Sequence, residues 1–451
     1  MKGAFQIILI MTLFFSCRSA GQNEILYNEV GEMKTDGGLM QGIPVYEESN
    51  VIYNRDGKAV LKVSLSQPVI IDSANKEMGW GFFQFPNLGR TIDNKLVAEW
   101  NMKPDAASAY GMGGNGRAES ADGGKSWQPY EKDTYPLFGV PLKNGDLIRI
   151  TTPKALKASE LKLPELIDSS RENYGRHYNY YRLHELPDNL QGVYLSRLPK
   201  GETKWVSEQA KLIDPQAARY SVDNSLFPVV WWGDVRTAAD GSLIAGIYPG
   251  FFVGEDNRVK PSGVFFYRST DYGKTWNVQG RILYEPDPKL DSNGLKRYAL
   301  GFTEPCFEIL KDGSFICIMR TTDGLGNSPM YIARSVDEGK TWTTPRVFTK
   351  AGVLPKILQL ENGVVALASG RPGMQIRFSI DGEGVQWTDP FEMLPFDIKN
   401  VKDAVSCGYP DIVPSGSNSF LLIYSDFKFK NYKGETRKAI KVREIFVDPV
   451  K

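Results

Sequence analysis

Apolar residues along the chain occur in short runs that are separated by polar turns. In six places an apolar run is followed by a turn rich in Asn, Asp, Ser or Gly and then by a second apolar run. These six segments begin at Pro86, Phe138, Gly233, Pro305, Pro355 and Pro410. Asn-Gly and Asp-Gly turns accept the positive φ that tight hairpins require, so each segment predicts a β-hairpin.

The spacing of these hairpins predicts the fold. They recur at intervals of about 50 to 95 residues, which indicates radial repetition with insertions in the longer intervals. The expected fold is all-β, a six-bladed β-propeller. Residues 76–451 are assigned to this propeller, with an insertion at about 152–192. Residues 21–75 form a lead-in that is expected to supply edge strands or to close the ring.

A second repeat has the form Ser-x-Asp-x-Gly-x-Ser/Thr-Trp. It contains Asp122, Asp271 and Asp337, and a copy with one extra residue contains Asp381. The aspartate caps local backbone N–H groups, the glycine adopts a left-handed conformation, and the tryptophan packs between blades. This repeat resembles the Asp box, or BNR repeat, of the bacterial sialidase (neuraminidase) superfamily. The resemblance implies a sialidase-like propeller in which these aspartates are structural and lie on outer turns.

The sialidase resemblance extends into the fourth hairpin. Glu304 lies eight residues before Asp312 and Arg320 lies eight residues after it, so both are expected at the open end of one hairpin. Residues 301–321 are similar to the sialidase segment that carries the glutamate assisting the nucleophile and the second arginine of a carboxylate-binding triad. A cross-strand ion pair with no role in chemistry is the alternative.

Tyr409 is expected at the corresponding level of the sixth blade. It lies eight residues before Ser417, in the turn of that hairpin, and Ser406–Pro410 resembles the sialidase segment with the nucleophilic tyrosine. A phenol has a pKa of about 10, so nucleophilic attack requires a nearby base, for which Glu304 is the candidate. A buried core tyrosine is the alternative in a chain with 21 tyrosines.

Two further residues are carried over from the family. Arg371 is the candidate for the third triad arginine, with Arg377 as the fallback, because a guanidinium pairs with a carboxylate through two parallel hydrogen bonds. Asp105 is the candidate acid/base, on the loop after the first hairpin. Acid catalysis would require a protonated Asp105, and a solvated loop aspartate is the alternative.

The chain departs from the family at the first triad arginine. Sialidases have an Arg-Ile-Pro sequence in blade one, where this chain has Gln84-Phe85-Pro86. A glutamine donates hydrogen bonds to a carboxylate but does not neutralise it. The glutamate that steadies this arginine in the family is also missing, because Tyr424-Ser425-Asp426 stands in its place. Gln84 is therefore expected in a pocket for a different acidic sugar or for a neutral one.

These residues together predict a sialidase-like exo-glycosidase that acts on glycans with retention of configuration. Tyr409 would be the nucleophile, Glu304 its base and Asp105 the acid, while Arg320, Arg371 and Gln84 would bind a terminal, acidic sugar. Two alternatives remain open: the same fold acting on a non-sialic sugar, and a non-catalytic glycan-binding propeller. The aromatic segment 176–184 would either rim the sugar pocket or pack on a neighbouring blade.

Composition excludes several other classes of function. The net charge of +1 gives no bulk attraction to nucleic acid or to an anionic membrane. The chain has two histidines, no CxxC spacing and no P-loop, so neither a metal nor a nucleotide cofactor is expected.

The N-terminus predicts export. Lys2 and the apolar run from Ala4 to Phe15 are typical of a signal peptide over residues 1–20. Cys17 stands in a loose lipoprotein box, so the exported protein would be either a periplasmic or cell-surface lipoprotein or a plainly secreted one. The remaining cysteines, Cys306, Cys317 and Cys407, are odd in number, which favours buried free thiols over a disulfide.

Overall fold

The structure is a computed structural model. It describes residues 31–33, 39–40, 43–44, 49–54, 57–105, 109, 114–130, 139–172, 175–226, 232–322, 328–371, 373–394 and 404–450. The predicted signal peptide, including Cys17, lies outside the described residues. No described helix is both long enough and apolar enough to cross a membrane.

The first three blades are antiparallel sheets of four consecutive strands, with an insertion inside the second. Blade one comprises β7 (Phe82–Arg90), β8 (Leu96–Met102), β9 (Asn115–Ser120) and β10 (Gln128–Pro129). Blade two comprises β11 (Val140–Pro141), β12 (Leu147–Ile150), β16 (Val193–Leu198) and β17 (Val206–Ile213). Blade three comprises β20 (Trp232–Thr237), β21 (Leu243–Phe252), β22 (Gly263–Ser269) and β23 (Thr275–Ile282).

Blades four to six follow the same plan. Blade four comprises β24 (Phe302–Ile309), β25 (Phe315–Thr321), β26 (Met330–Ser335) and β27 (Arg346–Thr349). Blade five comprises β28 (Val353–Gln359), β29 (Val365–Gly370), β30 (Met374–Ser379) and β31 (Phe391–Leu394). Blade six comprises β32 (Asp411–Gly416), β33 (Ser419–Lys430), β34 (Thr436–Pro449) and, from the other end of the chain, β5 (Ala59–Leu65).

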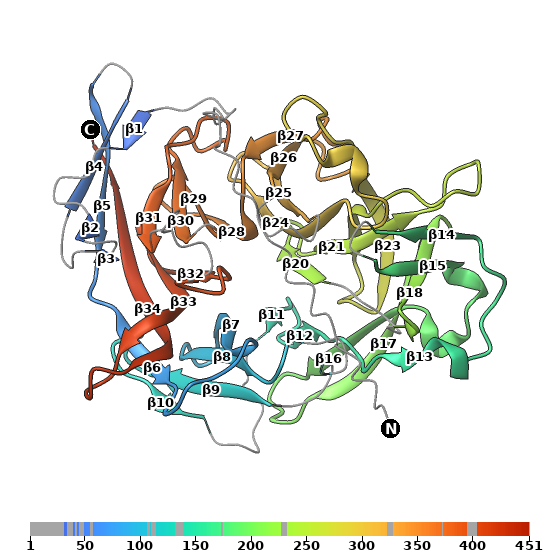
Figure 1. The fold of residues 1–451 in the computed structure, drawn as a ribbon, viewed down its shortest axis with the longest axis horizontal. Coiled ribbons are helices and arrows are strands. Elements are labelled where there is room, and N and C mark those ends of the chain that lie inside the picture. The colour runs from blue at the N-terminus through green and yellow to red at the C-terminus, as the bar shows by residue number, and fades with distance from the viewer. Residues whose placement is uncertain are drawn as a thin grey trace, which may run out of the picture.

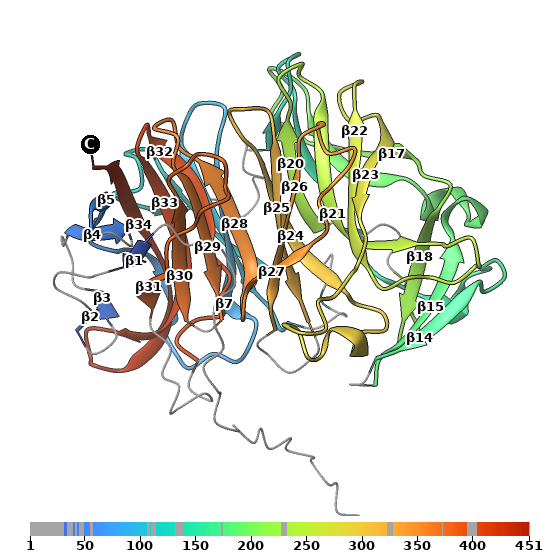
Figure 2. The same cartoon turned by 90° about the horizontal axis from the view of Figure 1, so that it is seen from above.

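The six blades form a ring, which confirms the predicted six-bladed propeller (Figure 1). The chain colours run once around this ring, and Figure 2 shows it from the edge, with the strands running between its two faces. Each of the six hairpins predicted from the sequence forms the first two strands of one blade. The first strand of each blade lies nearest the axis, so the starts of these hairpins surround it.

The hydrophobic core lies between neighbouring blades. In one cluster, Cys306 and Ile318 of blade four pack against Ile357 and Leu367 of blade five, with Trp387 fully buried among them. The equivalent clusters between the other blades have the same layout, because alternating apolar residues of two facing sheets interdigitate. Cys306, Cys317 and Cys407 are buried free thiols, as predicted.

The two ends of the chain meet in blade six. β5 pairs antiparallel with β34, placing Leu65 opposite Ile445, and β6 (Val69–Ser73) pairs with an earlier part of β34. β5 also pairs with β4 (Ser49–Asn54). Three shorter strands precede them: β1 (Gly31–Met33), β2 (Leu39–Met40) and β3 (Ile43–Pro44). A blade built from both ends of the chain closes the ring non-covalently and leaves no open edge between first and last blade.

The four Ser-x-Asp repeats are turns between the third and fourth strands of their blades. At Asp271, the carboxylate accepts hydrogen bonds from Ser269 Oγ and from the backbone N–H of Thr275, both at 2.8 Å. The indole of Trp276 donates to the carbonyl of Gly273, whose φ is 84°. Similar bonds occur in the turns of Asp122, Asp337 and Asp381.

The insertion between β12 and β16, together with two strands that follow β17, builds a side sheet at the outer edge of the ring, on the right of Figure 1. Its strands are β13 (Leu156–Lys157), β14 (Asp168–Arg171), β15 (His177–Arg182), β18 (Ala217–Val222) and β19 (Ser225–Leu226). Four short 3-10 helices occur among the described residues: η2 (Ala158–Glu160), η3 (Leu183–Glu185), η4 (Asp188–Leu190) and η5 (Gly294–Lys296).

The aromatic residues of this side sheet form its own small core. Tyr178 and Tyr180 are buried and pack against Phe251, whose ring centroid lies 4.9 Å from that of Tyr180. Of the two interpretations of segment 176–184, packing is therefore right and the rim of a sugar pocket is wrong for these two side chains.

Candidate active site

A cavity of about 1190 Å³ lies where the first strands of the blades come together. Its walls include Phe85 of blade one, Ile148 of blade two, Asp234 of blade three, Glu304 of blade four and Leu354 of blade five. Tyr409, two residues before the start of β32, completes it from blade six. Five residues proposed from the sequence line this axial cavity together: Asp105, Glu304, Arg320, Arg371 and Tyr409.

Tyr409, Glu304 and Arg320 form one hydrogen-bonded group. Tyr409 Oη donates to Glu304 Oε1 at 2.5 Å. Arg320 Nη1 donates to the same carboxylate oxygen at 2.6 Å and to Tyr409 Oη at 2.9 Å. Thr303 pairs with Arg320 across the β24–β25 hairpin, so Glu304 and Arg320 lie at one end of it, as their equal distance from Asp312 predicted.

Glu304 is held by a bulge at the start of β24. Its φ is 43°, Pro305 follows it, and the register of β24 against β25 shifts between Thr303 and Cys306. Leu354, with φ 40° and also followed by a proline, sits at the same kind of bulge in β28 and donates its N–H to Glu304 Oε2 at 3.0 Å. Such left-handed backbone at non-glycine residues persists only where its surroundings impose it.

Burial and charge together set the protonation of the group. Burial raises the pKa of Tyr409 well above its ordinary value, and the adjacent Glu304 carboxylate raises it further. Burial alone would lower the pKa of Arg320, but the Glu304 carboxylate outweighs it and the pKa is raised. Tyr409 is therefore a neutral phenol beside a permanently charged guanidinium, and the carboxylate is positioned to take its proton.

Arg371 approaches the group from the other side. Its guanidinium lies 5.4 Å from the ring centroid of Tyr409 and 5.6 Å from that of Trp80, and Nε donates to the carbonyl of Cys407 at 3.1 Å. The fallback residue Arg377 is buried, does not line the cavity and donates to Gln375. Of the two arginines, the structure brings Arg371 to the site.

Asp105 lies at the cavity beside Trp80. The indole Nε1 of Trp80 donates to Asp105 Oδ2 at 3.0 Å, and 47% of the Trp80 residue is exposed. Trp80 was not foreseen from the sequence. Its neighbour in the chain, the Gly81 backbone, is pressed against Lys103 and Asp105, since a Cβ on Gly81 would lie 2.3 Å from the Lys103 carbonyl oxygen. A glycine there lets the Asp105 loop approach the start of β7.

Gln84 does not line the cavity, which corrects the expectation that it takes the place of the missing arginine. It is completely buried, and neither its amide oxygen nor its amide nitrogen has a hydrogen-bond partner among the described residues. Phe85 lines the cavity instead, with its ring edge-on to Tyr409 at 4.9 Å between centroids. The cause is a bulge in β7, where φ is 54° at Phe83 and 52° at Phe85 and the register shifts on both sides of Gln84.

A proline signals this arrangement in the sequence. Phe85-Pro86, Glu304-Pro305 and Leu354-Pro355 each combine a positive φ with a following proline and a bulge. In each case the residue before the proline lines the cavity, together with the proline itself. Aligning the first strands on these prolines would have placed Phe85, rather than Gln84, at the axis.

A second charged cluster lines the cavity and was not foreseen. Lys356 Nζ lies 3.6 Å from Asp234 Oδ1 and 3.7 Å from Asp411 Oδ1. Asp411 Oδ2 accepts the backbone N–H of Leu88 at 2.9 Å. Burial alone would lower the pKa of Lys356, but Asp234 and Asp411 raise it above its ordinary value. The cluster ties blades one, three, five and six together across the axis.

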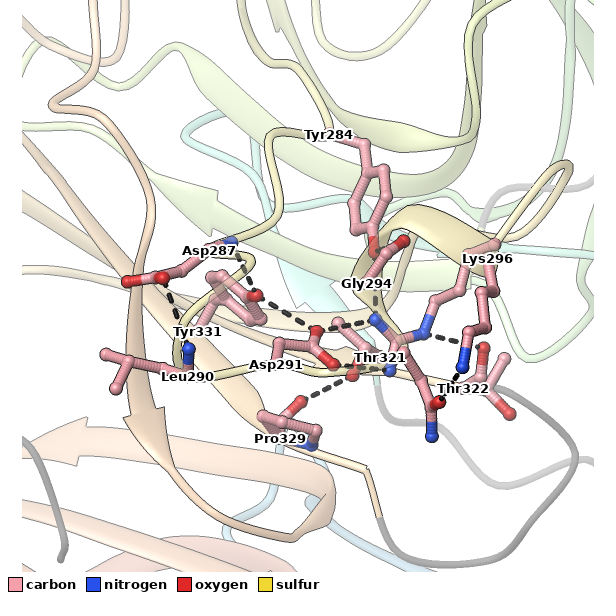
Figure 3. A network of polar contacts seen from close by, with 12 residues as sticks. Tyr284, Asp287, Leu290, Asp291, Gly294, Lys296, Thr321, Thr322, Pro329 and Tyr331 are labelled. Carbon is pink, nitrogen blue, oxygen red and sulfur yellow. Dashed lines mark hydrogen bonds and ion pairs between the residues drawn. The ribbon is translucent and has the colours of Figure 1, made fainter.

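A buried polar network supports the end of β25 just beyond Arg320 (Figure 3). Arg297 pairs with Asp291 through two hydrogen bonds of 2.5 and 3.2 Å, and its Nε donates to the carbonyl of Thr322 at 3.1 Å. Tyr331 Oη donates to Asp291 Oδ2 at 3.0 Å. The segment between β23 and β24 is thereby fastened to the strand that carries Arg320.

Within the described part of the chain, no group of three or more His, Cys, Asp or Glu side chains is arranged to hold a metal ion. The aspartates of the four Ser-x-Asp turns do not line the axial cavity.

No protein-family model matches this chain, and no curated protein matches its sequence. Among solved structures, it is similar to a protein of unknown function from Dyadobacter fermentans, with 18% identity, 86% of this chain and 99% of that chain covered, and a TM-score of 0.52. An α-L-arabinanase from Penicillium chrysogenum complexed with arabinobiose has 15% identity, 84% and 98% coverage and a TM-score of 0.47. The NanB sialidase from Streptococcus pneumoniae has 13% identity, 84% and 70% coverage and a TM-score of 0.45. At these identities the likeness concerns the fold, so the chemistry has to be argued from the residues of the axial cavity.

Proposed function

We propose that the protein is a sialidase-like retaining exo-glycosidase that removes a terminal, acidic sugar from a glycan. The observation that carries the proposal is the 2.5 Å hydrogen bond from Tyr409 to Glu304 inside a cavity that is also lined by Asp105, Arg320 and Arg371. A phenol in contact with a carboxylate and a guanidinium is a nucleophile with its base and its charge compensation in place.

In the first step Tyr409 Oη attacks the anomeric carbon while its proton passes to Glu304. The bond from that carbon to the leaving oxygen breaks, and Asp105 donates a proton to this oxygen. The product is a glycosyl-tyrosine and a free leaving alcohol. A neutral phenol suits an anionic sugar, because a carboxylate nucleophile would repel it.

In the second step a water molecule attacks the anomeric carbon from the side that the leaving group has vacated. Asp105 takes a proton from this water, and the bond to Tyr409 Oη breaks as Glu304 returns the proton to the phenol. Two displacements at one carbon retain its configuration. Arg371 would hold the anionic group of the sugar, with Arg320 beside it.

The same mechanism on a non-sialic sugar is a second candidate, favoured by one observation. Phe85 stands at the axis in blade one, and the aligned Gln84 is buried, so the start of β7 supplies no third guanidinium beside Arg320 and Arg371. Sialic acid and a uronic acid each carry one carboxylate, but in a uronic acid it is attached to C5 and not to the anomeric carbon, so a uronic acid would present its charge at a different place in the cavity.

The test is hydrolysis of a panel of aryl glycosides, comprising sialosides, uronides and neutral glycosides, by the wild type and by Tyr409→Phe. We expect at least one acidic member to be cleaved with retention, and the variant to lose about 10³-fold or more in kcat while keeping its fold. Tyr180→Phe, which removes the hydroxyl of a buried tyrosine of the side sheet, outside the cavity, is the matched control.

Equal rates for the wild type and Tyr409→Phe on a cleaved substrate would reject the tyrosine mechanism. Saturable glycan binding without cleavage of any panel member would instead support the non-catalytic glycan-binding propeller.

A further inference from the structure

The hairpin that joins β33 and β34 has an unusual charge. Its residues 427–438, called the basic hairpin below, contain five Lys or Arg and one Glu, a net charge of +4, whereas the whole chain carries +1. In Figure 1 this red hairpin lies at the outer edge of the ring, at the lower left. A local field of this sign attracts polyanions even though the molecule as a whole is almost neutral.

The strand register brings three of the five cationic side chains to one face of the hairpin. Lys430 pairs with Thr436, so both point to the same side, and side chains two residues away, Lys428 and Lys438, share it. The register shifts between Asp426 and Phe429, and this bulge brings Phe427 to the same face, where Lys438 Nζ lies 4.6 Å from its ring centroid. Lys428 and Lys430 are exposed.

This face continues to the mouth of the axial cavity. The rings of Phe427 and Trp80 meet edge-to-face at 6.3 Å between centroids. Lys438 Nζ donates to the carbonyl of Gly79 at 2.6 Å, next to Trp80 in the chain. Trp80 in turn lines the cavity and donates to Asp105. A ligand that leaves the cavity past Asp105 therefore meets aromatic rings and then lysines.

The tip of the hairpin presents an aromatic ring to solvent. Tyr432 is 92% exposed, and Lys433 Nζ lies 5.5 Å from its ring centroid. The turn is well ordered beneath it, since Asn431 Oδ1 accepts the N–H groups of Lys433 and Glu435, both at 3.0 Å. An exposed tyrosine on a fixed turn contributes nothing to the core, but its flat apolar ring suits the C–H face of a sugar.

We propose that the basic hairpin binds an acidic polysaccharide, as the site for the glycan chain whose terminal sugar occupies the axial cavity. Lysines would pair with carboxylates or sulfates along the chain, and Trp80, Phe427 and Tyr432 would contact sugar faces between them. The link to the cavity rests on the glycosidase function proposed above, whereas binding to the hairpin does not require turnover. The basic hairpin combines aromatic rings with lysines. An acidic polysaccharide alternates apolar sugar faces with negative groups, so it fits this combination better than a lipid surface does.

The test measures binding of Tyr409→Phe protein to polygalacturonate by affinity gel electrophoresis, with dextran as the neutral polymer. Added to Tyr409→Phe, Lys428→Gln/Lys430→Gln should weaken retention by polygalacturonate by roughly tenfold. Rising salt should also weaken the retention of the Tyr409→Phe protein itself. Tyr432→Ala should also weaken it, at all salt concentrations. The matched control is Lys204→Gln/Lys274→Gln, which removes two exposed lysines of blades two and three and should change nothing.

Unchanged retention on polygalacturonate in Lys428→Gln/Lys430→Gln would overturn the proposal. So would hairpin-dependent binding to phosphatidylserine vesicles or to single-stranded DNA without binding to polygalacturonate. When Tyr409 is retained, the substitutions Lys428→Gln/Lys430→Gln should raise KM for an acidic polymer that the enzyme cleaves. They should leave kcat/KM for an aryl glycoside unchanged. If the wild type cleaves no aryl glycoside, only the catalytic proposal is contradicted, because the binding experiment does not depend on turnover.

Discussion

Tyr409 and Glu304 are 105 residues apart in the chain, yet the phenol oxygen lies 2.5 Å from the carboxylate. They come from the starts of two blades that are not adjacent in the ring, and blade five between them contributes the Leu354 N–H that holds the second carboxylate oxygen. Glu304 therefore has one oxygen fixed by the backbone and the other facing the phenol. A base held in this way needs little rearrangement at the moment of attack.

The ionisation of Tyr409 is the first prediction. Burial and then the Glu304 charge raise its pKa, so the phenol stays neutral to a higher pH than an ordinary tyrosine. We expect no phenolate from Tyr409 at or below the ordinary pKa of about 10. Alkaline difference spectroscopy of the wild type and Tyr409→Phe should give equal numbers of ionised tyrosines up to that pH. One additional phenolate in the wild type would contradict a proton transfer to Glu304 during attack.

Asp105 is predicted to act on the leaving group. Asp105→Ala should slow hydrolysis of substrates with poor, basic leaving groups by about 10²–10⁴-fold, and slow activated aryl glycosides far less, because good leaving groups need no proton. Trp80→Phe retains the ring but removes the N–H that donates to Asp105. It should therefore slow the same reaction less than Asp105→Ala does. Equal losses on all leaving groups in Asp105→Ala would assign this residue to binding.

Gln84 is predicted to lower the stability of the fold and to take no part in substrate binding. Gln84→Met removes two buried polar atoms without hydrogen-bond partners and should raise the free energy of unfolding by about 1 kcal/mol. Gln84→Arg would bury a charge in the same place and should lower that free energy by about 3 kcal/mol or more, without a gain on sialosides. Urea unfolding of both variants measures this. A stable Gln84→Arg with new sialoside activity would show that the side chain reaches the cavity.

Lys356 is predicted to hold the cavity wall together. Lys356→Met leaves the buried Asp411 without its cation, whereas Asp234 keeps Arg236 at 3.7 Å, and this should lower the free energy of unfolding by about 3–5 kcal/mol. The triple variant Lys356→Met/Asp234→Asn/Asp411→Asn removes the charges together and should recover most of this loss. If denaturant unfolding finds the triple variant no more stable than Lys356→Met, the loss arises from packing rather than from charge.

The turn of Asp337 is predicted to give a pH-dependent contribution to stability. Hydrogen bonds, first from the Thr341 hydroxyl and then from its N–H, lower the pKa of Asp337 to about 2. A carboxylate with a lowered pKa in the folded state stabilises that state above its unfolded pKa, of about 4, and loses this effect as the pH falls towards the folded value. Asp337→Ala should therefore cost about 1 kcal/mol at neutral pH and progressively less between pH 4 and 2.

Thermal unfolding across this pH range checks the prediction for Asp337. Val336→Ala, at a neighbouring residue that is 86% exposed, should have no effect at any pH. A loss of stability in Asp337→Ala that stays constant down to the lowest pH would mean that the carboxylate charge is not involved.

Local patterns in the sequence were sufficient for the blades. A hairpin is specified by alternation of apolar residues and by a turn that tolerates positive φ, both of which involve neighbours in the chain, and all six hairpins occur as predicted. The positions of Glu304 and Arg320 followed from the same counting, because both lie on one hairpin. Tyr409 was reached by counting from the turn of another blade, which works because the blades repeat the same geometry around one axis.

Tertiary structure decided which neighbouring side chains face the axis. A bulge adds one residue to a strand and reverses the faces beyond it, so Phe85 lines the cavity while Gln84, one residue away, is buried. The cluster of Lys356 with Asp234 and Asp411, and the contact of Trp80 with Asp105, join blades and loops far apart in the chain. Periodicity describes only spacing along one strand, whereas these contacts depend on how six blades close around a common axis, and that closure is set by packing across the whole ring.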